Sequence, residues 1–250
     1  MASARAHETR VSDEGSRTAA CHRVASSTRC LAVSRSPVPS GIPFSQSSKA
    51  LLFRGVSQTL SSPAVHGGLE VAHETGLSAY LWASNVDFVA DGDPDDGARV
   101  EMDLMLGYTH ALSDRFTASA SLVQYFFPGT KPGFDYDYSE WIGSLTVDER
   151  HSLSLGYTPD VFGSGESGLY ISAAASVDLP AGLLLSAEIG HYDLQAAYGE
   201  SYQHGSVSIS GSVDAFTWQL TFHTTDNNAQ DLFYESIVAP KLVLSLNLSI

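Results

Sequence analysis

The connections between the alternating apolar and polar segments of this chain follow a regular long–short order. Twelve such segments lie between residues 49 and 250. Short connections fall near residues 74–76, 111–114, 148–151, 180–182 and 215, and longer ones near 87–97, 128–138, 159–168, 195–205 and 225–241. Outer-membrane β-barrels have this order, because tight turns join their strands on one side and longer loops on the other. The pattern therefore indicates the setting of the protein more firmly than its activity.

The most regular segment lies near residue 100, where Val100, Met102 and Leu104 alternate with Glu101 and Asp103. Successive side chains of a strand point to opposite faces, so this alternation predicts a strand with one apolar and one polar face. The same test applied along the chain predicts strands at residues 49–56, 65–73, 77–85, 100–109, 115–127, 139–147, 152–158, 169–179, 183–192, 206–214, 216–224 and 242–250.

We expect an all-β fold: a closed, transmembrane, antiparallel up-and-down β-barrel of about twelve strands, formed by residues 49–250. A soluble β-sandwich also alternates, with its apolar face against the core. Two features favour the barrel. The polar face is mostly Ser, Thr and Gly with almost no Lys, and several segments have nine or more residues, enough to span a bilayer when tilted. A closed sheet also pairs every backbone N–H and C=O, as a hydrocarbon environment requires.

Aromatic residues near the ends of the expected strands support the same interpretation. Transmembrane barrels carry aromatic girdles at the two membrane interfaces, whereas in a soluble fold these side chains would belong to the core. The candidate interface aromatics are Tyr108, Phe116, Trp141, Tyr157, Phe216 and Trp218.

Residues 1–48 lack this alternation and are rich in Ser, Arg, Ala and Pro. We expect them to form a disordered tail. They contain no apolar core of the length that a signal peptide requires, so we expect that a wrong start or an upstream frame error has replaced the signal peptide. An Arg-rich and Ser-rich transit peptide is the alternative. Both cysteines, Cys21 and Cys30, lie in this tail, so the remainder has no disulfide framework.

Charge is distributed unevenly along the chain. Residues 1–54 contain eight Lys or Arg and three Asp or Glu, whereas residues 55–250 contain five and twenty-five, giving net charges of +5 and −20. So acidic a body argues against nucleic-acid binding, which needs a basic surface. Carboxylates on the polar faces are expected to line a lumen and to favour cations over anions. Alternatively, they pair with the few basic residues or remain hydrated. They are Glu70, Glu101, Asp103, Glu140, Glu188 and Asp214.

Candidate enzymatic and metal sites are weak. Histidines and serines are both common, but no spacing indicates a catalytic triad. His66 and Glu70 share a face of an expected strand while His73 points the other way, so these three do not form a metal site. The acidic loop formed by Asp91, Asp93, Asp95 and Asp96 has oxygen ligands suited to Ca²⁺, but it departs from the EF-hand pattern, so a solvated acidic loop is the favoured interpretation. We expect no cofactor.

Three segments of this sequence resemble a known family. Residues 53–59 (FRGVSQT), 67–76 (GGLEVAHETG) and 82–88 (WASNVDF) resemble the TorF-type porin family of bacterial outer-membrane proteins. The resemblance extends over about residues 50–250. It implies a barrel and a pore but no established substrate. Two departures from the family are the absence of a recognisable strand before FRGVSQT and a C-terminal Ile250 where outer-membrane barrels usually end in an aromatic residue.

Together these observations predict a bacterial outer-membrane porin, a passive and cation-preferring channel for small solutes, rather than an enzyme. Its expected partners are outer-membrane lipid, the outer-membrane assembly machinery and the permeant solutes. One alternative is a non-conducting barrel whose long loops bind a surface partner or a metal. A second alternative is a lipid-modifying barrel enzyme.

Overall fold

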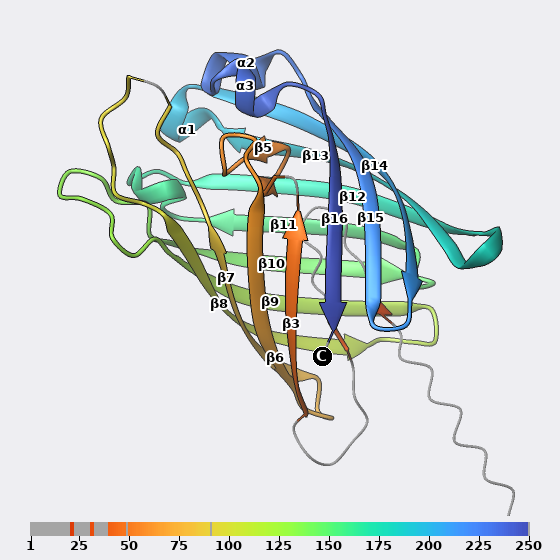
Figure 1. Ribbon diagram of the computed structural model, residues 1–250. Coiled ribbons are helices and arrows are strands. Elements are labelled where there is room, and N and C mark those ends of the chain that lie inside the picture. Colours follow the sequence, from red (N-terminus) through yellow and green to blue (C-terminus); the bar gives the residue numbers. More distant parts are fainter. Residues whose placement is uncertain (1–20, 23–30, 33–39, 49, 91, 250) are drawn as a thin grey trace, which may run out of the picture.

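The computed structural model describes residues 21–22, 31–32, 40–48, 50–90 and 92–249. Within this part of the chain, twelve antiparallel strands pair in the order of a closed barrel (Figure 1). Each strand pairs with its neighbour in sequence, and β16 pairs with β3 to complete the order. The strands are β3 (Ser40–Ser48), β6 (Ala64–Ala72), β7 (Leu77–Asn85), β8 (Val100–Ala111), β9 (Phe116–Phe126), β10 (Tyr138–Val147), β11 (His151–Thr158), β12 (Gly168–Leu179), β13 (Leu183–Leu194), β14 (Glu200–Val213), β15 (Phe216–Thr225) and β16 (Lys241–Ser249).

The prediction of the first strand at residues 49–56 is wrong. That strand is β3, Ser40–Ser48, which lies in the stretch expected to be a disordered tail. Its sequence, SGIPFSQSS, is mostly small and polar and lacks the alternation that identified the other strands. The tail also contains the paired two-residue strands β1 (Cys21–His22) and β2 (Leu31–Ala32). The other residues of the stretch that was expected to be a disordered tail lie outside the described residues.

The described residues of that segment, 50–56, instead belong to the connection between β3 and β6. Two short strands there, β4 (Leu52–Phe53) and β5 (Val56–Ser57), form a hairpin. Its turn consists of Arg54 and Gly55, which both have positive φ angles, of 50° and 85°. The sequence alternation in this segment therefore belongs to a hairpin within a connection. It does not belong to a strand of the barrel wall.

The long–short order of the connections is confirmed. The long connections and the short helices gather at one end of the barrel, which we call the loop end, and the tight turns lie at the other, the turn end (Figure 1). The helices are η1 (Val161–Gly163), α1 (Gln195–Tyr198), α2 (Asn228–Leu232) and α3 (Glu235–Val238), with η2 (Pro180–Gly182) in a tight turn. No described helix is long and apolar enough to cross a membrane.

One connection is shorter than expected, because β14 begins at Glu200 and not near residue 206. The first residues of β14 alternate in burial, with Tyr202 and His204 buried and Gln203 exposed. The buried residues of this part are themselves polar or aromatic, so the sequence shows no apolar–polar alternation there.

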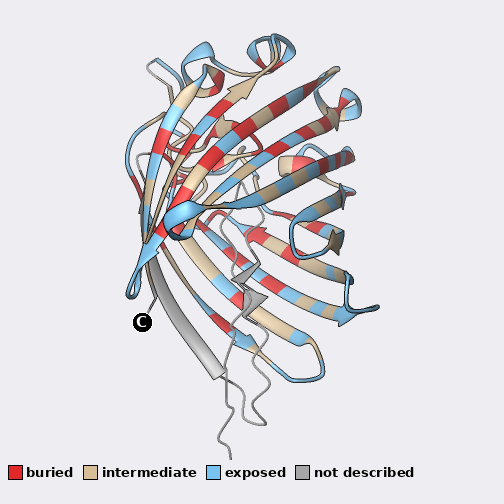
Figure 2. Cartoon of the chain, turned by 90° about the vertical axis from the view of Figure 1, so that its right-hand side faces the viewer, coloured by how far each residue is buried: buried red, intermediate tan, exposed pale blue. Residues whose placement is uncertain are grey.

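Buried and exposed residues alternate along the strands of the wall (Figure 2). Which residue types are buried is the reverse of what a soluble sheet shows. On β8, Met102, Leu104 and Leu106 are exposed, while Glu101 and Asp103 are each 2% exposed. Exposed large apolar side chains occur on all the strands from β6 to β16. The apolar face therefore points away from the barrel and is not covered by a second sheet, so the soluble-sandwich alternative is wrong.

Candidate functional site

The β4–β5 hairpin places a charged group inside the barrel. Arg54, at its turn, is 5% exposed, and its Nη2 lies 2.5 Å from Oε1 of Glu140 on β10. Glu140 is itself fully buried and also accepts a hydrogen bond of 3.2 Å from the hydroxyl of Tyr125 on β9. The hairpin is thus fastened to the far wall of the barrel by an ion pair.

Aromatic rings surround the Arg54 guanidinium. Its Cζ lies 4.5 Å from the ring centroid of Phe53, 4.0 Å from that of Tyr170 and 4.3 Å from that of Tyr192. Ring faces attract cations, most strongly where water is excluded. The hydroxyl of Tyr202 also donates a hydrogen bond of 3.1 Å to the carbonyl oxygen of Arg54. One carboxylate and three rings therefore compensate the buried positive charge.

The turn needs the glycine next to Arg54. A Cβ on Gly55 would lie 2.8 Å from Cβ of His204, and φ there is 85°. Arg54 has φ of 50°, a conformation that costs a side-chain-bearing residue about 1–2 kcal/mol. The ion pair with Glu140 and the ring contacts offset this strain.

Further aromatic contacts connect the hairpin with the wall. Phe53 meets Tyr125 and Phe162 edge to face, at centroid distances of 6.1 and 6.3 Å. Tyr125 in turn stacks on Tyr138 at 4.4 Å. The first residues of the FRGVSQT segment thus pack inside the barrel against its wall. The contacts of residues 53 and 54 could not be predicted from the sequence, because their partners are far away along the chain.

Five of the six carboxylates predicted to line a lumen are buried within the wall. Glu70, Glu101, Asp103, Glu140 and Glu188 range from 0% to 7% exposed. Among the described side chains, Arg54 is the only buried lysine or arginine. The alternative that basic residues neutralise the carboxylates thus holds for Glu140 and its partner Arg54.

The sixth carboxylate, Asp214, does not lie in the lumen. It is exposed in the tight turn between β14 and β15, with φ of 52°. Asp tolerates this left-handed region better than most residues because its short side chain forms local hydrogen bonds. The prediction for Asp214 failed because β14 ends one residue earlier, at Val213.

The candidate interface aromatics lie near both ends of the strands. Trp141 and Tyr157 are register partners toward the loop end, and both are exposed. Tyr108, Phe116 and Phe216 are exposed toward the turn end. Trp218 lies two residues from Phe216 and is half-buried. Contact of these rings with lipid headgroups stays a prediction.

The acidic loop is engaged in contacts with other side chains. Asp95 pairs with Lys131 at 2.5 Å and with Arg99 at 2.7 Å. The hydrogen bond from Lys131, helped by the Gly97 N–H and by Arg99, lowers the pKa of Asp95 to about 2. Asp91 lies outside the described residues.

The described residues include no group of three or more His, Cys, Asp or Glu that could hold a metal ion. The two histidines of the other candidate metal site are also in different environments. His66 is buried beside Trp82, whereas His73 is exposed in a tight turn. The structure therefore does not bring the residues of the candidate metal sites together.

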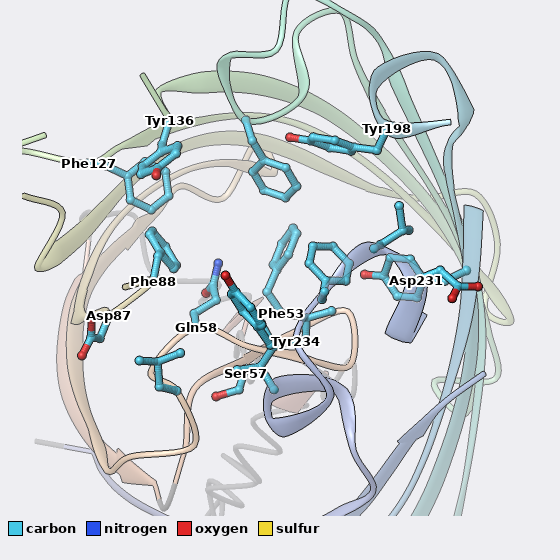
Figure 3. Close-up of a pocket in the computed structure, with 17 residues that line it drawn as sticks. Phe53, Ser57, Gln58, Asp87, Phe88, Phe127, Tyr136, Tyr198, Asp231 and Tyr234 are labelled. Atoms are coloured by element: carbon cyan, nitrogen blue, oxygen red, sulfur yellow. The ribbon is translucent and has the colours of Figure 1, made fainter. Parts of the chain in front are cut away.

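A cavity of about 570 Å³ lies on the loop-end side of the hairpin (Figure 3). The hairpin contributes Phe53, and the surrounding loops contribute further aromatic rings. Two carboxylates, Asp87 and Asp231, lie at opposite sides of the cavity. The cavity was not predictable from the sequence, because its lining residues come from separate connections and share no motif.

Two hydroxyls of this cavity are directed toward the acidic loop. Tyr234 donates a hydrogen bond of 2.8 Å to Asp93, and Tyr136 donates one of 3.2 Å to Asp96. Burial, reinforced by Asp96, raises the pKa of Tyr136 to about 12, so this phenol remains a neutral donor at physiological pH. The rings of both tyrosines remain available to the cavity.

Known structures with a similar fold are outer-membrane porins. The KdgM porin aligns with a TM-score of 0.52 at 6% identity, covering 84% of this chain and 99% of that one. The NanC porin aligns with a TM-score of 0.51 at 10% identity, covering 84% of this chain and 98% of that one. Identities this low support the fold alone. A search of curated proteins gave no match.

The sequence itself matches one family model. The match covers residues 40–248 and so begins at the first residue of β3 and ends within β16. This range agrees with the wall of twelve strands and includes the inward hairpin. The chain therefore belongs to the family described as "Bacterial protein of unknown function (Gcw_chp)".

Proposed function

We propose that this protein is a transmembrane β-barrel of the bacterial outer membrane that acts as a narrow, cation-preferring passive channel for small solutes. The observation that supports this most strongly is the reversed burial pattern of the wall, with leucines outside and carboxylates inside. In this proposal the protein is a porin of the TorF type, which its sequence resembles. It includes outer-membrane lipid and the assembly machinery as partners.

The outer face favours lipid over water. Full burial of a large apolar side chain is worth about 1.5–3 kcal/mol, and residues such as Leu81, Leu106 and Ile189 are 46%, 56% and 69% exposed. In water this surface would promote aggregation. A bilayer would cover this apolar surface and so remove the unfavourable contact with water. Such an environment also requires every backbone N–H and C=O group in the wall to be paired, as these groups are in a closed sheet.

The inner face favours cations. Five buried carboxylates on the described wall strands and the buried Arg54 guanidinium give the inner face of the wall a formal charge of −4. Rings of carboxylates select cations in channels. One of the similar structures is titled as the KdgM porin in complex with disordered oligogalacturonate. An acidic interior would repel a polyanion of that kind, so we do not extend this ligand to the present chain.

The inward hairpin favours a narrow passage and also supports one alternative. Arg54 and the surrounding tyrosines occupy the interior near Glu140. A barrel blocked there would not conduct, and its long loops would then carry the function by binding a surface partner. The lipid-modifying alternative has no comparable observation in its favour.

Planar-bilayer recording on the refolded full chain tests the proposal. Under a KCl gradient we expect discrete conductance steps with a reversal potential that shows cation preference. Replacing Glu101→Gln together with Asp103→Asn should move the reversal potential toward zero, because two lumen charges are lost. Asp214→Asn is the matched control, since Asp214 lies exposed in a turn. Absence of steps would reject the channel, and anion preference would reject the carboxylate lining.

A further inference from the structure

The loop-end cavity combines the features of a ligand site. Its volume of about 570 Å³ lies within the range of small-molecule pockets. Aromatic rings from three connections face one another across it, with Phe88, Phe127 and Tyr136 grouped on one side and Tyr198 on the other (Figure 3). Phe88 contacts Phe127 at a centroid distance of 5.6 Å and Tyr136 at 5.5 Å. The ring cluster is thus held together by its own contacts.

The charged residues that line the cavity are both acidic. Asp87 and Asp231 line it, and its seventeen lining residues include no lysine, arginine or histidine. Asp93 and Asp96 do not line the cavity, but they accept hydrogen bonds from the hydroxyls of two lining residues, Tyr234 and Tyr136. Asp96 is also paired with Arg99 at 3.3 Å. A phenol that donates to a carboxylate has a more electron-rich ring, and such a ring attracts a cation more strongly.

The hydrogen-bonding groups of the lining tyrosines are largely occupied. The hydroxyl of Tyr234 donates a hydrogen bond to Asp93, and that of Tyr136 donates one to Asp96. The hydroxyl of Tyr202 donates a hydrogen bond to the carbonyl oxygen of Arg54. Their side chains line the cavity while their hydroxyls are engaged in these hydrogen bonds. A sugar needs several free donors and acceptors, whereas an apolar cation needs ring faces and a nearby negative charge. The lining therefore favours the cation.

The same barrel already holds a cation of its own in such an environment. The Arg54 guanidinium lies within 4.5 Å of three ring centroids and 2.5 Å from the Glu140 carboxylate. Glu140 compensates its charge, so Arg54 adds little repulsion toward a second cation in the cavity above. Phe53 contacts Arg54 and also lines the cavity.

We propose that this cavity binds small organic cations with an apolar body, such as quaternary ammonium compounds or hydrophobic amines. The rings of Phe88, Tyr136 and Tyr234 would enclose the apolar body, and Asp87 and Asp231 would compensate the charge. This inference deepens the proposed function and rests on it, since the cavity lies at the loop end of the same barrel. It names a class of solute that the passage would select.

Isothermal titration of the refolded full chain tests the proposal with three probes of similar size: benzyltrimethylammonium, benzyl alcohol and benzoate. The detergent should be an uncharged polyoxyethylene ether, because zwitterionic detergents carry a quaternary ammonium group and glycosidic ones carry a sugar. We expect the cation to bind at least about tenfold more tightly than the other two, a difference of about 1.4 kcal/mol. Equal binding of the three probes, or preference for the alcohol or the anion, would overturn the inference.

Two variants locate the site. Asp87→Asn combined with Asp231→Asn should weaken binding of the cation by about tenfold and leave binding of benzyl alcohol unchanged. Asp214→Asn makes the same kind of charge change in a tight turn at the other end of the barrel and should have no effect. Unchanged affinity in the double variant would overturn the assignment to this cavity. A barrel that conducts without binding the probe rejects this inference alone, and one that binds without conducting rejects the channel alone.

Discussion

Gly156 on β11 shows how closely the wall is packed around the Arg54–Glu140 ion pair. A Cβ at this position would lie 2.7 Å from Glu140 Oε1 and 3.1 Å from Arg54 Nη2. Both atoms belong to buried charges, which are costly to separate because each loses its compensation in a medium of low polarity. The glycine therefore leaves the space in which the ion pair forms.

We predict that Gly156→Ala lowers the free energy of unfolding by about 1–3 kcal/mol, the usual cost of crowding a packed interior. Urea unfolding in lipid vesicles measures it. Gly143→Ala on the adjacent strand β10 is the control, since a Cβ there meets nothing within 4 Å. Equal stability of the two variants would show that the ion pair does not depend on this space.

At the level of single residues, the sequence predicts side chains that repeat with the strand period and misses those that do not. Glu101 and Asp103 were found because they alternate with leucines and methionines along one strand. Arg54 was not, because its partner Glu140 is 86 positions away and no local pattern connects the two. Asp214 was placed in the lumen by continuing the alternation one residue past the end of β14.

Among the elements, the β4–β5 hairpin is the one that places a charged side chain, Arg54, inside the barrel. Its flanking strands are already adjacent, because Ser48 of β3 and Ala64 of β6 are register partners. Two antiparallel strands in this register can be joined by a tight turn of a few residues. The long connection is therefore not required to form the wall.

Replacing residues 50–62 by a four-residue turn should leave the barrel folded and raise its single-channel conductance several-fold, because the constriction at Arg54 is removed. Planar-bilayer recording measures the conductance, and circular dichroism verifies the strand content. A folded variant with the conductance of the parent protein would mean that the hairpin does not limit the passage.

The acidic loop between β7 and β8 forms a contact that depends on pH. The pKa of Asp95 is lowered from 3.8 to about 2, chiefly by the hydrogen bond from Lys131. A carboxyl group whose pKa falls on folding contributes stability above its unfolded pKa and loses it as the pH falls through the folded value. The contact between this loop and the next should thus be complete above about pH 4 and weaken toward pH 2.

Carboxyl NMR titration of labelled aspartate checks this prediction. In Lys131→Met the midpoint of Asp95 should rise toward 3.8, since the largest cause of its shift is removed. Arg115→Met removes a comparable exposed partner of Asp148 at the other end of the barrel and should leave Asp95 unchanged. An unaltered midpoint in Lys131→Met would contradict the assignment of the shift to this contact.

The strands themselves were largely predictable, because a wall with lipid on one side and polar groups on the other must alternate. The first strand was missed because β3 is mostly small and polar, so nothing in Ser40–Ser48 repeats strongly with period two. The loop-end cavity was missed for a different reason. It is assembled from residues of several connections that come together only when the strands are paired.

For the molecule as a whole, the ring of strands depends on β3. This strand pairs with β6 over nine residue pairs but with β16 over five, so the junction between β3 and β16 is the shorter of the two. An open edge at this position would expose unpaired N–H and C=O groups, which hydrocarbon does not tolerate. The proposal of a transmembrane barrel therefore requires this junction to form in the membrane.

A cysteine pair tests the junction. Ser47 and Leu246 are register partners, and opposite residues of antiparallel strands lie close enough for a disulfide. With Cys21 and Cys30 replaced by serine, Ser47→Cys combined with Leu246→Cys should cross-link under mild oxidation in vesicles. The cross-linked barrel should then resist unfolding by heat in dodecyl sulfate. Ser47→Cys combined with Leu242→Cys is the control, because the shift of four residues separates the two positions by about 14 Å along the strand. Cross-linking of the control but not of the register pair would mean that β16 pairs differently. Absence of cross-linking in both would mean that the sheet is open between β3 and β16, and a membrane-spanning barrel would then need another strand to close it.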